Sequence, residues 1–159
     1  MTQNHVPTRT ESRIVDVIFG PGVRIVEPVN IYGCVVGAET FIGPFTEIQK
    51  NVDIGSRCKI QSHTFICELV TIGDECFIGH GVVFINDLFE AGEPARGDRS
   101  KWRSTRVGNR VSIGSNATIL PVSIADGTVI GAGSVVTKNI LRAGVYAGNP
   151  AQLIRPLPG

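Results

Sequence analysis

The sequence predicts an all-β chain that folds as a parallel β-helix of hexapeptide repeats, and three regularities support this fold class. An aliphatic or aromatic residue recurs at every sixth position, a small side chain follows four residues later, and glycine often follows directly. A strict period of six fits neither the 3.6-residue helix nor simple strand alternation. The uninterrupted series is Val36, Ile42, Ile48, Ile54, Ile60, Ile66, Ile72, Ile78 and Phe84.

This period also predicts which residues lie side by side. Three hexads make one triangular coil, so residues 18 apart are expected to stack at the strand spacing of about 4.8 Å. The small residues are expected to face a narrow interior, and the glycines to relax the backbone where the chain turns each corner. The outward columns predicted in this way are Lys50–Glu68–Asn86 and Ser62–His80, with His63 beside the second.

The chain divides into a polar tail over residues 1–16 and a β-helix domain over residues 17–159. The tail has no apolar signal core, so we expect a tail or a cap there. Prolines blur the register at the start of the domain, and the first coil is expected near Val23 or Val29.

Residues 86–106 interrupt the coils. This segment is highly charged, has no apolar period and is too long for an ordinary turn, so we expect an arm that projects from one corner. The period resumes at Val107 and continues to about Val136, with one corner tightened by a residue at Pro121. The final stretch, AGVYAGNPAQLIRPLPG, is too irregular for another coil and is expected to cap the core.

The length, net charge, hydropathy and cysteine content of the chain exclude some classes of function. The chain has 159 residues, which suits about one domain, and its net charge of +1 without a basic stripe argues against nucleic acid as a partner. No apolar run approaches the roughly 18 residues of a membrane span. Cys58 and Cys76 stack closely enough for a disulfide, but two reduced core thiols in a cytoplasmic protein is the favoured interpretation.

Three strings resemble the hexapeptide acyltransferases that fold as a left-handed β-helix: IGSNATILPVSI, VIGAGSVVTKNI and YAGNPAQLI. The resemblance covers roughly residues 23–155. It implies the left-handed sense, acetyl-CoA as co-substrate near the YAGNPAQLI end, and a homotrimer whose active sites are shared between subunits.

Four further strings resemble the nucleotide-linked amino-sugar N-acetyltransferases, which act on 3-amino sugars for bacterial surface polysaccharide, including lipopolysaccharide. They are YGCVVG, IGPFTEIQKNVDIG, KIQSHTFICE and FIGHGVVFIND. In that group a glutamate and an asparagine lie one coil apart, with the asparagine at the entrance to the long loop. Glu68 and Asn86 match in type, spacing and place.

Two features differ from other enzymes of this fold. The loop has no histidine, which argues against O-acetyl transfer with a loop histidine as base. We also expect no N-terminal α/β domain of the kind that binds the nucleotide in some 4-amino-sugar enzymes, so the coils, the loop or a neighbouring subunit are expected to hold the nucleotide.

Acetyl transfer to an amine needs a neutral nitrogen, a positioned thioester and a route for the proton. Asn86 is expected to hold the amine or a sugar hydroxyl, and Glu68 to accept a hydrogen bond from the amine, while the departing thiolate takes the proton. The alternatives are a Glu68–Lys50 salt bridge and a turn role for Asn86. His63 and His80 are the other candidate bases, unless they are corner residues that bond the backbone.

The resemblance implies a coenzyme A groove between parallel subunits, lined by small residues, with two cations that meet phosphates. The groove residues are Ser115, Asn116, Ala117, Ala132 and Gly133, and the cations are Lys138 and Arg155. The small residues can equally fill the interior. In the loop, Trp102 with Arg99, Lys101, Arg103 and Arg106 is expected to close over a nucleotide through stacking and charge, and Asp87 is a further candidate substrate contact. A solvated loop and a loop cap at Asp87 are the alternatives.

The predicted function is therefore acetyl-CoA-dependent N-acetylation of a nucleotide-linked amino sugar in the cytoplasm. No metal is expected, because only His63 and His80 lie in the coils and a zinc site normally needs three protein ligands. The alternatives are a non-catalytic β-helix assembly module and an acetyltransferase for another small acceptor, such as an amino acid or antibiotic.

Overall fold

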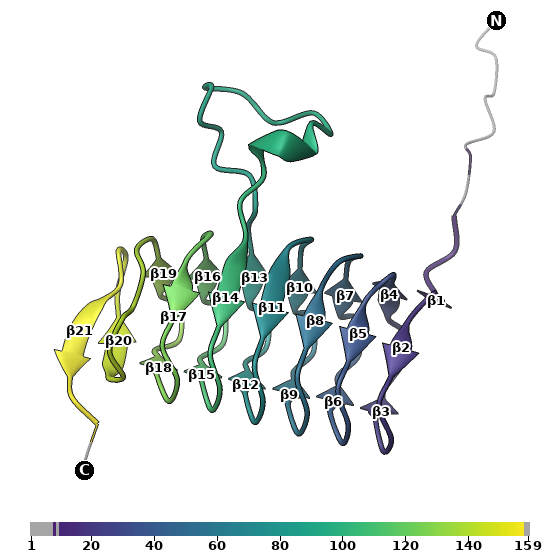
Figure 1. Cartoon of the computed structure of the whole chain (residues 1–159), viewed down its shortest axis with the longest axis horizontal. Coiled ribbons are helices and arrows are strands. Elements are labelled where there is room, and N and C mark those ends of the chain that lie inside the picture. The colour runs from purple at the N-terminus through teal and green to yellow at the C-terminus, as the bar shows by residue number, and fades with distance from the viewer. Residues whose placement is uncertain (1–7, 9, 158–159) are drawn as a thin grey trace, which may run out of the picture.

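A computed structural model of the chain describes residue 8 and residues 10–157, and it confirms a left-handed parallel β-helix with three flat faces (Figure 1). Each face is one sheet, with strands added in the order of the coils. Sheet A consists of β1 (Ile14–Val15), β4 (Asn30–Tyr32), β7 (Glu47–Ile48), β10 (Phe65–Ile66), β13 (Val83–Phe84), β16 (Thr118–Ile119) and β19 (Val135–Val136).

The other two faces carry the remaining strands. Sheet B consists of β2 (Ile18–Phe19), β5 (Val35–Val36), β8 (Asp53–Ile54), β11 (Val70–Ile72), β14 (Thr105–Val107) and β17 (Ser123–Ile124). Sheet C consists of β3 (Arg24–Ile25), β6 (Phe41–Ile42), β9 (Lys59–Ile60), β12 (Phe77–Ile78), β15 (Ser112–Ile113), β18 (Val129–Ile130), β20 (Val145–Ala147) and β21 (Gln152–Arg155).

Strand pairing confirms the predicted stacking. Phe65 pairs with Glu47 in the coil before it and with Val83 in the coil after it, a spacing of one full coil each time. The pairing of Thr118 with Val135 is one residue shorter, as expected for the tightened corner at Pro121. We call the corners between successive sheets the AB edge, the BC edge and the CA edge.

The interior is built from the two predicted slots. The large slot is closed to solvent, with Ile42, Ile60 and Ile78 each 0% exposed. The small slot does more than fill space, because the Thr40 hydroxyl and the Cys58 thiol donate to corner carbonyls of the next coil, at 2.9 and 3.1 Å. All four cysteines are buried free thiols. Backbone carbonyls inside the prism are thus satisfied without water.

The corner glycines serve a different purpose from the one predicted. Gly55 and its equivalents do not have positive φ; instead a Cβ on Gly55 would lie 2.5 Å from the Asp74 carboxylate of the next coil. The left-handed residue stands two positions later and is often charged, as at Arg57 and Glu75, whose φ values are 56° and 59°. Close coil-to-coil approach therefore requires these glycines.

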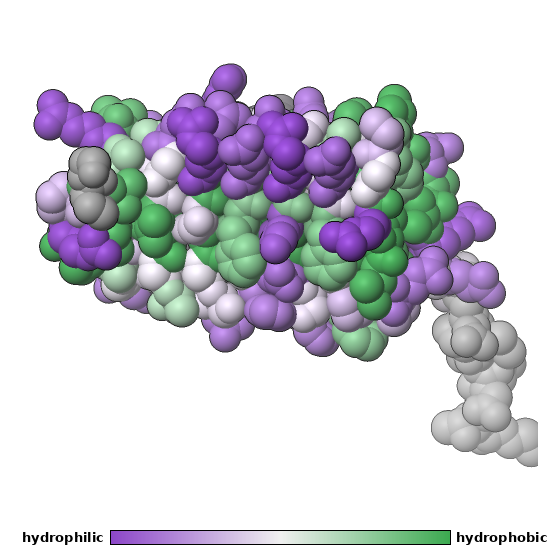
Figure 2. Space-filling model, turned by 90° about the horizontal axis from the view of Figure 1, so that it is seen from below, coloured by the Kyte–Doolittle hydropathy of each residue, from purple (hydrophilic) through white to green (hydrophobic). Residues whose placement is uncertain are grey.

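Charged corner residues form a continuous row along the BC edge. Glu39, Arg57, Glu75 and Arg110 alternate in sign from coil to coil, and Arg57 Nη2 lies 2.9 Å from Glu75 Oε1. A row of hydrophilic side chains runs along the molecule in the view from below (Figure 2). Because this edge is strongly hydrated, it is a poor place for a ligand groove.

The first coil begins earlier than Val23 or Val29. β1 pairs with β4, so residues 14–16 belong to the helix, while residues 1–7 and 9 lie outside the described part. The end coil has no neighbour on its outer side, so its inward-facing Ile14 and Phe19, which pair with the buried Ile31 and Val36, are each 37% exposed. The apolar period is blurred there because the first coil is 17 residues long, with five residues instead of six from Ile14 to Phe19.

The interruption is an arm that leaves the AB edge between β13 and β14 (Figure 1). The arm ends at residue 104, because Thr105 and Arg106 already pair with Val70 and Thr71 in sheet B. It contains one 3-10 turn, η1 (Arg99–Lys101). Residues 86–104 are called the loop from here on.

The C-terminal cap is more regular than expected. β20 continues sheet C in parallel with β18, and β21 then pairs antiparallel with β20. The hairpin therefore ends the solenoid by turning the chain back along its last strand. Within the described residues no helix has the length and hydropathy needed to cross a bilayer.

Candidate functional site

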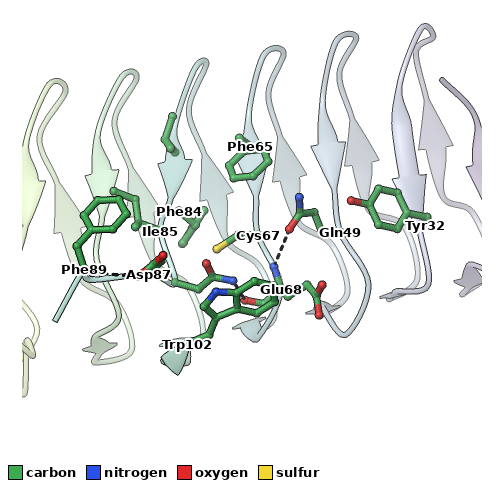
Figure 3. Close-up of a pocket in the computed structure, with 12 residues that line it drawn as sticks. Tyr32, Gln49, Phe65, Cys67, Glu68, Phe84, Ile85, Asp87, Phe89 and Trp102 are labelled. Carbon is green, nitrogen blue, oxygen red and sulfur yellow. Dashed lines mark hydrogen bonds between the residues drawn. The ribbon is translucent and has the colours of Figure 1, made fainter. Parts of the chain in front are cut away.

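A pocket of about 390 Å³ lies where the loop meets the coils, and we call it the loop pocket (Figure 3). Its floor is the outer face of sheet A, one wall is the AB edge and the other wall is the loop. Aromatic rings form much of its lining. The residues that define it are Tyr32, Gln49, Phe65, Cys67, Glu68, Val83, Asn86, Asp87, Phe89 and Trp102.

Asn86 and Glu68 meet in this pocket, as their spacing predicts. Asn86 Nδ2 donates to the Glu68 backbone oxygen at 3.2 Å, and the Asn86 backbone oxygen accepts from Arg103 N at 2.9 Å. These bonds fix both ends of the loop base. The Asn86 Oδ1 receives no hydrogen bond from any residue that the structure describes, so it can accept one from a ligand.

The Glu68 carboxylate is already occupied by protein groups. Its side chain is 8% exposed, and Oε2 accepts from Asn51 Nδ2 at 3.2 Å and from Arg99 Nη2 of the loop. Its Oε1 lies 3.8 Å from Lys50 Nζ, the salt bridge considered as the alternative role. Two cations thus neutralise this buried charge. The catalytic role of Glu68 stays a prediction.

The loop has internal order of its own, centred on Asp87. Both oxygens of this carboxylate accept backbone hydrogen bonds, from Phe89 N at 3.0 Å and from Ala95 N at 2.7 Å. These bonds, with that from Ala95 the larger effect, lower the pKa of Asp87 below its ordinary value. Asp87 therefore organises the loop, and its predicted substrate contact remains untested.

Two other loop residues differ in their surroundings. Trp102 is half-buried and lines the loop pocket, with the Arg99 guanidinium 5.8 Å from its ring centroid. Arg103 is exposed and pairs with Glu90 at 2.9 Å, outside the pocket lining. Of the two, Trp102 is the better placed to touch a ligand in the pocket.

The histidines lie on a different edge. His63 and His80 are exposed at the CA edge, and Phe45 stacks on His63 with ring centroids 4.9 Å apart. Strands β10 and β13 of sheet A separate them from the AB edge. Within one subunit, the four predicted catalytic residues therefore lie at two edges, with Glu68 and Asn86 at the AB edge and His63 and His80 at the CA edge.

Most of the predicted coenzyme A groove shares the CA edge with the histidines. Asn116 N donates to His80 O, and Gly133 N donates to Ser115 O, each at 2.8 Å. Ser115, Asn116, Ala132 and Gly133 thus continue the histidine column toward the C-terminal end. The Ala117 side chain is 0% exposed and fills the interior, which was the alternative reading of these residues.

The two predicted phosphate-binding cations lie elsewhere. Lys138 is exposed at the AB edge of the last coil, in a cavity of about 260 Å³ that it shares with Tyr146 and Leu153 of the C-terminal hairpin. Arg155 is exposed in β21, where Nη1 donates to Pro156 O at 3.3 Å. Neither belongs to the Ser115 column.

Sequence reasoning missed Tyr32, Gln49, Phe65 and Cys67. The column rule could have found Gln49, Phe65 and Cys67, because Gln49 and Cys67 are 18 apart, as are Phe65 and Val83. Tyr32 is equivalent to Gln49 at a spacing of only 17, so counting by 18 misses it. Gln49 is also an anchor, since its Oε1 accepts from Glu68 N at 3.3 Å. The Glu68–Arg99 contact had no signal in the sequence.

Cys67 is the cysteine that lines the loop pocket, and burial raises the pKa of its thiol to about 12. A thiol with such a pKa is almost wholly protonated at neutral pH and is a poor nucleophile. We expect Cys67→Ala to retain acetyl transfer within about twofold, and we expect no covalent acetyl-enzyme. Intact mass after incubation with acetyl-CoA tests this; an added acetyl group that Cys67→Ala abolishes would contradict it.

Within the part of the chain that the structure describes, no three His, Cys, Asp or Glu side chains are grouped so that they could hold a metal ion.

Comparison with known protein families gives two matches. Residues 33–68 match the model described as bacterial transferase hexapeptide (six repeats). Residues 69–85 and 104–138 match the hexapeptide repeat of succinyl-transferase. Together the matches cover more than half of the chain and leave out the loop.

Among curated proteins, the bifunctional protein GlmU of Streptococcus uberis is 33% identical over 149 residues, which is 89% of this chain and 32% of GlmU. The chain thus spans about a third of the length of the curated relatives it matches.

Solved structures share the fold. The hexapeptide-repeat acetyltransferase VCA0836 of Vibrio cholerae, in complex with acetyl coenzyme A, has a TM-score of 0.67 at 25% identity, over 80% of this chain and 72% of its own. A mutant of AntD, an N-acyltransferase from Bacillus cereus in complex with dTDP and coenzyme A, has a TM-score of 0.62 at 21% identity, over 90% of this chain and 82% of its own.

Proposed function

The chain belongs to the hexapeptide-repeat acyltransferase family, and from this membership we propose that it acetylates the amino group of a nucleotide-linked amino sugar, with acetyl-CoA as donor. The observation that carries the proposal is Asn86, which lines a pocket of about 390 Å³ at the loop entrance and whose Oδ1 receives no hydrogen bond from the described residues. We assign the 3-amino position to the acceptor because the Glu68–Asn86 pair resembles that of the 3-amino-sugar enzymes.

The donor follows from the family. VCA0836, at 25% identity, was crystallised with acetyl coenzyme A. We place the cofactor along the CA edge, where Ser115, Asn116, Ala132 and Gly133 leave the backbone accessible. Small side chains there allow backbone amides to reach the pantetheine.

The acceptor fits the loop pocket. Its floor and walls carry Phe65, Phe89 and Trp102, which can stack on a base or a sugar face. The same fold accommodates a nucleotide together with the cofactor, since AntD was crystallised with dTDP and coenzyme A. A product of this kind suits surface polysaccharide synthesis, and the four free cysteines suit a reducing cytoplasm.

In the proposed reaction the neutral sugar amine attacks the thioester carbonyl. Asn86 Oδ1 accepts one N–H of the amine and orients its lone pair. The new C–N bond forms, the C–S bond breaks, and the proton lost by nitrogen ends on the departing thiolate. His63 or His80 can relay this proton only if the CA edge comes close to the loop pocket.

We propose that a homotrimer brings these edges together. Within one subunit, sheet A lies between the CA edge, with its cofactor column, and the AB edge, with Asn86. A threefold arrangement can place the CA edge of one subunit against the AB edge of the next. The active site would then be shared between subunits.

The experiment is a thiol-release assay with acetyl-CoA and a panel of UDP- and dTDP-linked 3-amino and 4-amino sugars. We expect turnover of one 3-amino sugar, with kcat/KM on the order of 10⁴ M⁻¹s⁻¹ or higher. Turnover of a 4-amino sugar alone would correct the position of the amine. Failure of every sugar, together with no binding of acetyl-CoA, would leave a non-catalytic β-helix.

A further inference from the structure

Few side-chain contacts hold the loop to the coils. Of its residues only Ala95 is buried, at 3% exposure. Apart from the bonds of Asn86 at the base, its described side-chain hydrogen bonds and ion pairs are internal, as for Asp87–Ala95 and Arg103–Glu90, with one exception. A segment with so few buried contacts opens easily.

The exception is the ion pair between Arg99 and Glu68. Arg99 belongs to η1 in the distal part of the loop, while Glu68 belongs to the coil below Asn86. The Glu68 carboxylate is 8% exposed and also accepts a hydrogen bond from Asn51 of the preceding coil. A charge-assisted bond to a preorganised, shielded carboxylate is stronger than an ordinary surface ion pair.

The same arginine touches the pocket wall. The Arg99 guanidinium lies 5.8 Å from the Trp102 ring centroid, and Trp102 lines the loop pocket together with Asn86. An arginine held by Glu68 therefore also holds the indole. If that pair breaks, the remaining hydrogen bonds of Trp102 are those of its own backbone to Arg99 and Arg103, and none of them involves the indole.

We infer that Glu68 and Arg99 form a latch that closes the loop over the loop pocket, and that Glu68 is a positioning residue in acetyl transfer. The second half of this inference rests on the proposed function, whereas the latch itself does not. Glu68 would act on the substrate through Arg99 and Trp102 rather than by touching the amine.

Trp102 is the single tryptophan of the chain, so its fluorescence reports the state of the loop without any substrate. We expect Glu68→Gln and Arg99→Gln each to raise the acrylamide quenching constant of Trp102 by about twofold or more. Tryptic cleavage after Arg96 and Lys101 should become faster in both variants. Glu75→Gln is the matched control, because it removes a Glu–Arg pair on the BC edge and should leave Trp102 quenching unchanged.

A double variant separates the latch from direct catalysis. If Glu68 acts through Arg99, Glu68→Gln/Arg99→Gln should be no worse than either single variant, in quenching and in kcat/KM. Each single variant should raise KM for the sugar by about tenfold and change KM for acetyl-CoA little. Arg99→Lys keeps the positive charge at an exposed position, so its Trp102 quenching and KM for the sugar should lie between those of Arg99→Gln and the native protein. This variant is the control for a loss of folding in Arg99→Gln.

Unchanged quenching and unchanged proteolysis in folded Glu68→Gln and Arg99→Gln would overturn the latch. A multiplicative loss of kcat in the double variant, with quenching as in the native protein, would overturn the positioning role and return Glu68 to direct catalysis. Increased quenching without turnover of any sugar would support the latch and refute only the proposed acceptor.

Discussion

Replacing Asn86 with alanine is expected to lower kcat/KM for the amino sugar by about 100-fold or more. The substitution removes Oδ1, the free acceptor proposed to orient the amine, and also the Nδ2 bond to the Glu68 backbone oxygen at 3.2 Å. The affinity for acetyl-CoA should change little, because the CA edge is untouched. Thiol release at saturating acetyl-CoA, with the preferred sugar varied, measures the effect.

Asn109→Ala is the matched control for this experiment. Asn109 also bonds neighbouring coils through its side chain, accepting from Asp74 N at 2.9 Å, but it lies on the BC edge, away from both groups of site residues. It should keep full activity per folded molecule while losing about 1 kcal/mol of stability. Native turnover in Asn86→Ala would contradict the proposed site and direct attention to His63 and His80.

Replacing Ile78 with alanine is expected to lower the free energy of unfolding by about 2–5 kcal/mol. Ile78 is 0% exposed and stacks between Ile60 and Ile113 of the adjacent coils, so no neighbour can fill the cavity without shifting a whole coil. Urea unfolding followed by circular dichroism measures the change. The subunit concentration must be held constant, because association contributes to apparent stability.

Ile18→Ala is the control of the same residue type. Ile18 lies in the first coil and is 67% exposed, so its truncation should change stability by no more than about 0.5 kcal/mol. Equal losses at Ile18 and Ile78 would mean that the outer face of sheet B at the end coil is covered in solution, and that exposure in the single subunit does not describe the assembled protein.

The coil lattice was predictable in detail, and so was part of the site. A period of six requires every inward residue to meet the same narrow interior, so Ile60 and Ile78 could be placed from sequence alone. Stacking then placed Asn86 over Glu68, and the structure confirms their contact at 3.2 Å. Each coil contacts only its neighbours, so positions in the coils can be predicted by counting residues along the sequence.

The hexapeptide period does not predict contacts of the loop, which leaves the coils, and it does not say directly which residues share an edge of the prism. The loop has no period, so nothing in the sequence indicated that Arg99 would reach Glu68. The sequence grouped Arg99 with Trp102 only as one of several cations of the loop, and the structure shows which cation lies by the ring. Which triangle edge a residue occupies depends on the corners before it, and this put Lys138 on the loop's edge and the histidines beside the column of Ser115, Asn116, Ala132 and Gly133.

The sequence by itself therefore determined the architecture, the core and the Glu68–Asn86 column, because each follows from repeated short-range geometry. Only the tertiary structure decided that the Glu68 carboxylate is bound by Arg99 of the loop and by Asn51, and that the candidate residues divide between two edges of the prism. The Arg99 contact joins residues 31 apart and depends on the shape of a non-repeating loop, whereas the Lys50–Glu68 pair follows from the 18-residue column. No periodic pattern encodes the contact with Arg99.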